Sequence, residues 1–433
     1  MDQLALLGGT PVLEQPYPIH NPLGEEEKQA VIEVMDKKII SDFIGRAGDK
    51  FCGGEYVLAF EKLMCDMFSV EYSVSFNSAT TALQAAVTAA GVGPGDEVIT
   101  SPYTMSATAS AILLNNAIPV FADIEDDTYC LNPKEVEKLI TERTKAILVV
   151  NIFGGSARYD ELLAIAQKYS LIVIEDNAQA IGGTYKGQHL GTIGDIGVFS
   201  FNVHKHIQCG EGGVLVTNNN KYAQRAQLVR NHGEVVMDDL VSAGEDFYPI
   251  VGSNYRLSEL HAAVAIEQLK KMEKLNKTRV DLALYLSEQL QHIDWINGAY
   301  ILPETRHVFY VYPMKFIIEN IGISRRVFAE AMKAEGFPIN EGYVKPLYLM
   351  PVYQKKRMFP HSQFPFVSTE YLTDVSYDKG ICPVTDRLFD EDFIFTGICH
   401  HPRTKEDMDL FIQAIKKIEY HIDALKKYET EAT

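Results

Sequence analysis

The 433-residue sequence lacks the features that mark several large classes of protein. It contains no apolar run as long as a membrane span. Its beginning, MDQLALLGGTPVLEQPYP, has neither the basic segment nor the full apolar segment of a secretory signal. Basic residues are in deficit, with 40 Lys and Arg against 58 Asp and Glu and a net charge of -18, which argues against nucleic acid or an anionic membrane as a partner. We therefore expect a cytoplasmic protein of the size of an enzyme.

Several binding motifs are also missing. The six cysteines are scattered and form no CxxC pair, so the sequence indicates neither a disulfide framework nor a zinc knuckle. No GxxxxGK[ST] phosphate loop is present, and GEGG at 210–213 is not a dinucleotide fingerprint, because it precedes a strand and lacks a third glycine at the required offset. His204, His206, His400 and His401 have no second set of ligands at metal spacing, so we expect no metal site.

What the sequence does contain is an alternation of short apolar strands and helical segments from about residue 70 to 220. β-branched strands with intervening helices are typical of an α/β protein with a mainly parallel sheet. The chain is also too long for one compact core. We expect an N-terminal arm over 1–24, a large domain over 25–293 that holds this sheet, and a small α/β domain over 294–433 that ends in an amphipathic helix over 404–429.

Three polar features lie where strands of this sheet are expected to end, and open parallel sheets bind ligands there. LIVIED ends in Asp176, FNSATTAL opens a helix with Ala79 and Thr80, and Lys205 follows the strand GDIGVFSF. Each has an ordinary alternative: a cap for Asp176, a helix N-cap for the hydroxyl residues, and a solvated surface turn for Lys205. Their combination favours another interpretation, because a lysine, an acid and an anion cradle are what a pyridoxal phosphate site needs.

The order of longer segments resembles the DegT/DnrJ/EryC1/StrS family of sugar aminotransferases, a branch of the fold-type I enzymes that use pyridoxal phosphate. The resemblance extends from about residue 5 to 420 and rests on segments such as NSATTAL, GVGPGDEVI, SPYTMSATASAI, IEDNAQAIGGTYKG, KHIQCGEGG and GSNYRLSELHAA. It implies a large lobe with a mainly parallel sheet that binds pyridoxal phosphate, a smaller C-terminal α/β lobe and an N-terminal arm. It also implies a homodimer with a shared active site.

Carried over residue by residue, the resemblance implies a set of catalytic and cofactor-binding residues. Lys205 would form the Schiff base with the cofactor and shuttle protons. Asp176 would pair with the pyridine nitrogen, and Gln179 would contact the ring face or the phenolic oxygen. The phosphate would be held by Ala79, Thr80, Ser200 and, from a second subunit, Asn254.

Three positions of this implied site differ from the commonest pattern of the family. Met105 stands where an aromatic residue often stacks on the pyridine ring, and Asn202 stands where a histidine usually follows the serine. NSAT also replaces the more frequent NSGT. None of these changes touches Lys205, so we expect them to bear on the subclass of substrate.

Lys205 lies between two histidines, and one branch of the family carries histidine in place of the lysine and acts as a dehydratase. The lysine is the fifth residue after Ser200, and four residues separate it from Gly210. Both spacings place Lys205, not a histidine, at the reactive position, so we expect transamination. A dehydratase or isomerase that uses the same cofactor is the alternative. A non-catalytic regulator that senses the cofactor is disfavoured, because the chain has no DNA-binding module with a basic face.

The expected substrates also follow from the resemblance. It implies glutamate or glutamine as the amino donor and a keto group on a sugar, sugar acid or cyclitol as the acceptor, in amino-sugar biosynthesis for a secondary metabolite or a cell-surface polysaccharide such as lipopolysaccharide. LALLGGTPVL and GYVKPLYLMPVYQ resemble segments of longer members that act on free cyclitols or sugar acids. Tyr343, Tyr348 and His232 are candidate contacts to the acceptor, and a packing role is an equally open alternative for each.

Overall fold

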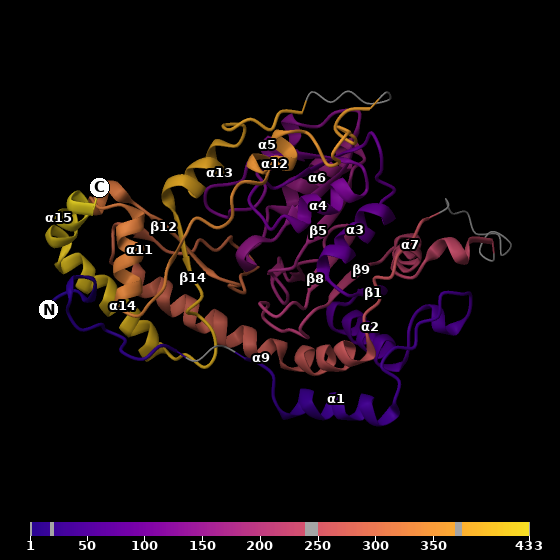
Figure 1. Cartoon of the computed structure of the whole chain (residues 1–433), viewed down its shortest axis with the longest axis horizontal. Coiled ribbons are helices and arrows are strands. Elements are labelled where there is room, and N and C mark those ends of the chain that lie inside the picture. Colours follow the sequence, from indigo (N-terminus) through magenta and orange to yellow (C-terminus); the bar gives the residue numbers. More distant parts are fainter. Residues whose placement is uncertain (1, 18–20, 239–249, 369–374, 433) are drawn as a thin grey trace.

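A seven-stranded sheet forms the larger of two parts of the molecule, at the right of Figure 1, in a computed structural model that describes residues 2–17, 21–238, 250–368 and 375–432. In spatial order its strands are β1 (Tyr72–Phe76), β9 (Gly213–Thr217), β8 (Ile196–Ser200), β5 (Ile172–Asp176), β4 (Thr144–Val150), β2 (Glu97–Thr100) and β3 (Ile118–Phe121). Pairing is parallel from β3 to β8, whereas β9 runs antiparallel to both β8 and β1. The prediction of a mainly parallel sheet is confirmed.

Helices cover this sheet, whose strands are buried along nearly their whole length because their residues are mostly aliphatic and β-branched. The helices of the larger part are α2 (Glu55–Phe68), α3 (Ala79–Ala89), α4 (Ala107–Leu114), α5 (Pro133–Lys138), α6 (Tyr159–Tyr169) and α7 (Asn220–Arg230). Single turns lie at η2 (Asp49–Phe51), η3 (Ile152–Gly154) and η4 (Gly233–Val235). In the chain, helices such as α3 and α4 lie between successive strands of the sheet, as the sequence alternation predicts.

The long helix α9 (Glu259–Leu290) runs along the lower edge of both parts in Figure 1, and α1 (Glu25–Lys37) packs beneath it. Ser258 caps the start of α9, since its hydroxyl accepts a hydrogen bond from the His261 amide at 3.3 Å. Among the helices of the described residues, none has both the length and the apolar character that crossing a membrane requires.

The smaller part, at the left of Figure 1, is built on a four-stranded antiparallel sheet. Its strands are, in order, β10 (Ile296–Asn297), β12 (Tyr312–Phe316), β14 (Phe393–Thr396) and β13 (Asn340–Glu341). A third, small sheet consists of β11 (Thr305–Arg306), β6 (Thr184–Tyr185) and β7 (Gln188–His189). The remaining elements are η1 (Ala5–Leu7), α10 (Ile318–Ile321), α11 (Arg325–Ala334), η5 (Leu347–Leu349), α12 (Pro351–Gln354), α13 (Pro383–Arg387), η6 (Leu388–Asp392), α14 (Lys405–Tyr420) and α15 (Ile422–Ala432).

The C-terminal segment ends in two helices where the sequence predicts one, and part of it packs against the large sheet. The helix predicted over 404–429 is two helices, because the chain leaves helical geometry at His421, whose amide bonds back to the Ile418 carbonyl at 3.1 Å. In addition, buried residues within 347–366 and 377–382 pack with α4 and β3, so these described segments lie against the large sheet. The predicted domain boundaries therefore stay a prediction.

Candidate active site

Asp176 is the last residue of β5, beside the strand β8 that leads to Lys205. Its side chain is 5% exposed. One carboxylate oxygen, Oδ2, accepts a hydrogen bond from Thr108 Oγ1 at 2.7 Å, and Oδ1 accepts one from the Ala178 amide at 3.2 Å. Burial raises the pKa of Asp176, while these donors and the charge of Lys205 lower it. The hydrogen bond from the Ala178 amide is the one that a turn-capping aspartate would make. Capping a turn does not, however, require a buried carboxylate next to a lysine.

The neighbouring Glu175 has a different role, since its side chain points to the interior of the fold. It is fully buried and accepts four hydrogen bonds, from the Tyr159 hydroxyl at 2.6 Å and from the amides of Gly191, Ile193 and Gly194 at 2.6 to 2.7 Å. All of its polar capacity is therefore used within the protein. Glu175 holds the 191–194 loop on the sheet and takes no part in the candidate site.

Lys205 lies in the loop between β8 and β9, which leaves the sheet after Ser200 and returns to it at Gly213, the register partner of Ser200. The lysine is half-buried, and its Nζ lies 4.7 Å from the centre of the Tyr310 ring. Burial lowers the pKa of Lys205 to about 8, and the negative charge of Asp176 opposes this shift. A solvated lysine in a surface turn does not have these properties, so the ordinary alternative does not describe this residue.

The two histidines beside the lysine have other environments. His204 is exposed, and its amide bonds to the side chain of Asn202 at 3.2 Å. His206 is fully buried, with Nε2 at 3.0 Å from the Val308 carbonyl, to which it donates. Lys205, between them, is the residue whose pKa the charge of Asp176 raises against the effect of burial.

Gln179 and Tyr343 meet in the candidate site from opposite halves of the chain. Gln179 accepts a hydrogen bond from the Phe153 amide at 2.9 Å and donates one to the Tyr343 hydroxyl at 2.8 Å. The ring of Tyr343 packs edge-on against Phe153, with ring centres 4.9 Å apart. Burial raises the pKa of Tyr343, and the charge of Asp176 acts in the same direction. The predicted acceptor contact Tyr343 is thus placed beside a predicted cofactor contact.

The start of α3 has the form of an anion cradle. Ala79 and Thr80 occupy its first turn, where backbone amides have no acceptor within the helix. Ser78 is the N-cap of this helix, as expected if the hydroxyl residues only cap it. Its hydroxyl accepts a hydrogen bond from the Thr81 amide at 3.2 Å. This start lies tightly against β9, because a Cβ atom on Gly213 would lie 2.4 Å from the Ala79 amide nitrogen. The amides of this first turn have no acceptor within the helix, and that of Ala79 lies next to the strand that follows the lysine loop.

For the other predicted cofactor contacts, the structure gives burial and local hydrogen bonds. Ser200 is 4% exposed at the end of β8, and its hydroxyl accepts a bond from the Asn202 amide at 3.3 Å. The Asn202 side chain bonds to the Glu211 carboxylate at 3.1 and 3.2 Å. Met105 is 58% exposed just before α4, and Asn254 is exposed. The roles of all four residues stay predictions.

Two predicted acceptor contacts are not brought to this edge of the sheet by any contact among the described residues. Tyr348 has no exposed surface, packs with Phe121 and donates its hydroxyl to Asp386, so its placement is that of a packing residue. His232 has a positive φ of 53° and lies with Nδ1 3.9 Å from Glu234.

The sequence did not point to two residues that contact the reactive pair. Thr108 binds Asp176 directly, and Tyr310 lies under the amine of Lys205. Thr108 is within the quoted segment SPYTMSATASAI and lies in the first turn of α4, where its hydroxyl is 3.2 Å from that of Thr104 in the preceding bend. HVFYVY around Tyr310 contains no comparable signal.

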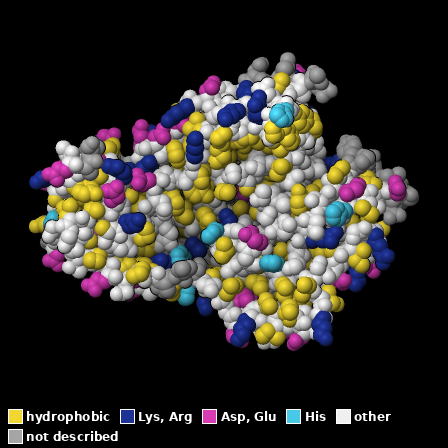
Figure 2. All heavy atoms as spheres, in the orientation of Figure 1, with side chains coloured by type: hydrophobic (Ala, Val, Ile, Leu, Met, Phe, Trp, Pro, Cys, Tyr) yellow, Lys and Arg dark blue, Asp and Glu magenta, His cyan; other side chains and the backbone are white. Residues whose placement is uncertain are grey.

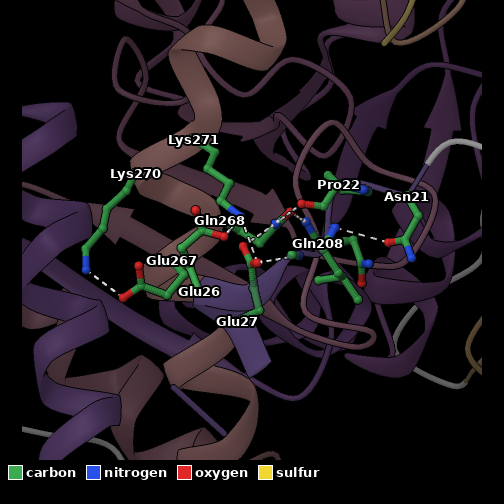
Figure 3. Close-up of polar contacts among 11 residues, drawn as sticks. Asn21, Pro22, Glu26, Glu27, Gln208, Glu267, Gln268, Lys270 and Lys271 are labelled. Carbon is green, nitrogen blue, oxygen red and sulfur yellow. Dashed lines mark hydrogen bonds and ion pairs between the residues drawn. The ribbon is translucent and has the colours of Figure 1, made fainter. Parts of the chain in front are cut away.

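A polar network fixes the far side of the lysine loop (Figure 3). Gln268 on α9 is fully buried, and its Oε1 accepts a hydrogen bond from the Gln208 amide at 3.1 Å. Its Nε2 donates to Glu27 Oε1 at 2.7 Å and to the Pro22 carbonyl at 3.1 Å. Lys271 lies 2.7 Å from the other oxygen of Glu27 and compensates its charge. The loop that carries Lys205 is therefore tied to α9, α1 and the end of the N-terminal arm.

Comparison with known proteins adds evidence that is independent of this geometry. The family model for the DegT/DnrJ/EryC1/StrS aminotransferase family matches residues 23–389. The chain is 34% identical to the L-glutamine:scyllo-inosose aminotransferase of Streptomyces griseus over 79% of this chain and 81% of that protein. It is 33% identical to the GDP-perosamine synthase of Caulobacter vibrioides over 76% of this chain and 85% of that protein. Among solved structures, Helicobacter pylori PseC, an aminotransferase of pseudoaminic acid biosynthesis, matches with a TM-score of 0.76 and 26% identity over 94% of this chain and 100% of that chain.

Proposed function

The chain belongs to the DegT/DnrJ/EryC1/StrS aminotransferase family, and we propose that it uses pyridoxal phosphate to move an amino group from glutamine or glutamate to a ketone of a sugar or cyclitol. One observation carries this proposal. Lys205, with a lowered pKa, and Asp176, with a raised pKa, come from neighbouring strands and act on each other at one edge of the sheet. The relatives whose names include glutamine and an inosose support this donor and a cyclitol acceptor.

The residues present fit pyridoxal phosphate. The amine of Lys205 is the group that binds an aldehyde, and its lowered pKa keeps more of it unprotonated near neutral pH. A carboxylate made more basic by burial, as Asp176 is, holds a proton on a ring nitrogen strongly. The open amides of Ala79 and Thr80 suit a phosphate. When bound, the cofactor supplies a carrier for the amino group and a ring that accepts an electron pair.

The protein groups then have defined tasks. Lys205 Nζ would accept the proton from the α-carbon of the donor and return one to the acceptor carbon that comes to bear the amino group, and Asp176 would keep the ring nitrogen protonated. Gln179, fixed by Phe153 and Tyr343, orients the ring. Over a full cycle the donor CH–NH2 becomes a C=O and the acceptor C=O becomes a CH–NH2, so atoms and electrons balance. We also infer a homodimer that shares the site through Asn254, which is exposed and therefore accessible to a second copy.

The product of the donor reaction tests the proposed function. The cofactor-loaded enzyme, mixed with glutamine or glutamate and no acceptor, is expected to release one equivalent of the corresponding 2-oxo acid per site. Addition of a cyclitol ketone or keto-sugar should then restore the starting cofactor spectrum and give an amino product by mass spectrometry. Lys186→Ala, at an exposed lysine paired with Asp160, is the control that should behave like the unaltered enzyme. Loss of water from a sugar without any 2-oxo acid would instead identify a dehydratase.

The pKa of Lys205 predicts the pH dependence of cofactor attachment. Only the unprotonated amine attacks the aldehyde, so the rate of attachment to the apoenzyme should rise with pH and level off above about 8. Asp176→Asn removes the charge that favours the protonated amine, and the midpoint should move to lower pH. Stopped-flow absorbance across a pH series measures both, with Asp160→Asn as the surface control. A midpoint near the ordinary lysine value of about 10.4 would contradict the burial of this amine.

A further inference from the structure

The chain just before β12 joins the small part of the molecule to the large part beside the lysine loop. The amides of Val308 and Tyr310 donate hydrogen bonds to the carbonyls of Gly154 at 2.9 Å and Phe153 at 2.8 Å, both in η3. From the lysine loop, His206 Nε2 donates to the Val308 carbonyl at 3.0 Å. The backbone that carries Tyr310 is therefore fixed from two directions.

Phe153 links Tyr310 to a predicted cofactor contact. Its carbonyl accepts the hydrogen bond from Tyr310, and its amide donates to the Gln179 side chain at 2.9 Å. Phe153 is fully buried and has a positive φ of 58°, a conformation that is uncommon for a bulky residue. Such a conformation persists only where the surrounding structure over-determines it. The position of Tyr310 relative to Gln179 is thus held at a cost in backbone strain.

The ring of Tyr310 is the aromatic surface on which the amine of Lys205 lies. Nζ is 4.7 Å from the centre of the ring, within the distance of about 6 Å that a cation–π contact allows. The negative face of a ring attracts an ammonium far more than a neutral amine, so this contact favours the protonated form. Burial has the opposite effect on Lys205. Figure 2 shows basic and histidine side chains gathered at the recess between the two parts of the molecule.

The titratable groups around this contact leave the ring neutral. The groups that interact with Lys205, or with Tyr310 and His206 beside it, are Asp176, Arg279, His307 and Tyr343. Asp176 is the charged group that acts on Lys205 itself, and it favours the ammonium. Burial lowers the pKa of both histidines and raises the pKa of both tyrosines, so all four side chains are uncharged near neutral pH. The amine of Lys205 therefore faces an uncharged aromatic ring.

We propose that the ring of Tyr310 holds the amine of Lys205 in its proton-carrying form whenever this amine is not bound to the cofactor. The inference rests on the proposed aminotransferase function, in which Lys205 takes a proton from the α-carbon of the donor. In that step the lone pair of Nζ forms the new N–H bond, and the electron pair of the broken C–H bond stays with the substrate. The ring stabilises the ammonium that the step creates more than the amine that precedes it. Tyr310 thus supports proton transfer and not substrate binding.

The pH dependence of Lys205 labelling tests the proposal in enzyme loaded with pyridoxamine phosphate, in which the lysine is free. Acetic anhydride modifies the unprotonated amine, and peptide mass gives the extent of labelling at each pH. Tyr310→Leu removes the ring and should lower the midpoint by about one pH unit, because the ammonium loses a stabilising contact. Tyr310→Phe keeps the ring and should leave the midpoint in place.

A second tyrosine and lysine pair provides the matched control. Lys168 Nζ lies 4.8 Å from the centre of the Tyr169 ring at the surface of α6. Tyr169→Leu removes a ring from a lysine in the same way, but far from the recess in the chain fold that holds Lys205. It should leave the Lys205 midpoint unchanged.

Fluorinated phenylalanines in place of Tyr310 separate the electrostatics of the ring from its packing. Fluorine withdraws electrons and weakens the negative face, while the shape of the ring changes little. The Lys205 midpoint should therefore fall stepwise from phenylalanine through its monofluoro, difluoro and trifluoro forms. These replacements keep the packing of the ring, so they give a result even if Tyr310→Leu does not fold.

Kinetics of the donor half-reaction give a further readout that a purely structural residue would not affect. Tyr310→Leu should lower the rate constant about three- to tenfold and leave the KM for glutamine nearly unchanged. Glutamine deuterated at the α-carbon should show a larger isotope effect in the variant, because proton transfer becomes more strongly rate-limiting.

The proposal fails if the Lys205 midpoint is the same in the unaltered enzyme, in folded Tyr310→Leu and across the fluorinated series. It fails equally if Tyr310→Phe shifts the midpoint as much as Tyr310→Leu, which would assign the effect to the hydroxyl group. Because the labelling needs no turnover, these results are separate from a failure of the aminotransferase function itself.

Discussion

Replacing Lys205 by alanine is expected to lower kcat by about 10⁴-fold, the upper end of what a positioned proton-transfer group contributes. The variant loses both the amine that binds the aldehyde and the group that moves the proton. Steady-state assay of 2-oxo acid release measures the loss. Reduction with borohydride should link the cofactor covalently to the peptide that carries Lys205 in the unaltered enzyme and not in the variant.

The flanking histidines provide the control for this first prediction. His204→Ala changes an exposed side chain next to the lysine and should retain nearly full activity. The Lys205→Ala protein should also melt within a few degrees of the unaltered enzyme. The variant loses a half-buried amine with a lowered pKa, and Asp176 keeps its hydrogen bonds from Thr108 and the Ala178 amide. Substantial turnover by Lys205→Ala would refute the assignment of the reactive lysine.

Asp176→Asn is expected to reduce kcat/KM by roughly 10- to 1,000-fold with little loss of stability. A carboxylate partner shifts the pKa of a neighbouring cation by about 1 to 3 units, so its removal lowers the protonated fraction of the ring nitrogen by a similar number of decades. The amide oxygen of asparagine still accepts from Thr108, which preserves the local packing. Assays of kcat/KM, cofactor titration and thermal melting measure the two effects separately.

Glu175→Gln is the matched variant one residue earlier in the same strand. It removes the charge from a carboxylate that accepts bonds from Tyr159 and three backbone amides, and it points an NH2 group at those donors. We expect a loss of about 2 to 4 kcal/mol in the free energy of unfolding and near-normal turnover in the folded fraction. If instead Asp176→Asn destabilises the protein as much as Glu175→Gln and stays active, Asp176 is a turn cap and not a cofactor ligand.

The elements that could be predicted from the sequence are those with a strong local pattern. The run LIVIED becomes β5, and its final acid lies at the edge of the sheet because parallel strands all end there. Lys205 could be placed as well, since the spacing from Ser200 and to Gly210 defines its position in the loop. Tyr343 also reaches the site, although only its bond to Gln179, 164 residues away in sequence, shows this.

The residues that could not be predicted act across large sequence separations. Tyr310 meets the amine of Lys205 only after the small part has packed on the lysine loop, and it lies in no motif. Tyr348 lies in an aromatic segment like that of Tyr343, yet it packs against Phe121. The reason is that η5 lies against β3 of the large sheet. Aromatic composition alone does not tell a ring that lines a site from one that fills a core.

The pairing of β1 with β9 bears on the order in which the site is made. Tyr72 is the register partner of Thr217, the last residue of the large sheet. All strands of this sheet have therefore been synthesised once the first half of the chain is complete. The start of α3, Asp176 and Lys205 all lie within that half. Domains usually fold as units during synthesis, the N-terminal one first. A nascent chain would thus bring the start of α3, Asp176 and Lys205 together before α9 and Tyr343 have been synthesised.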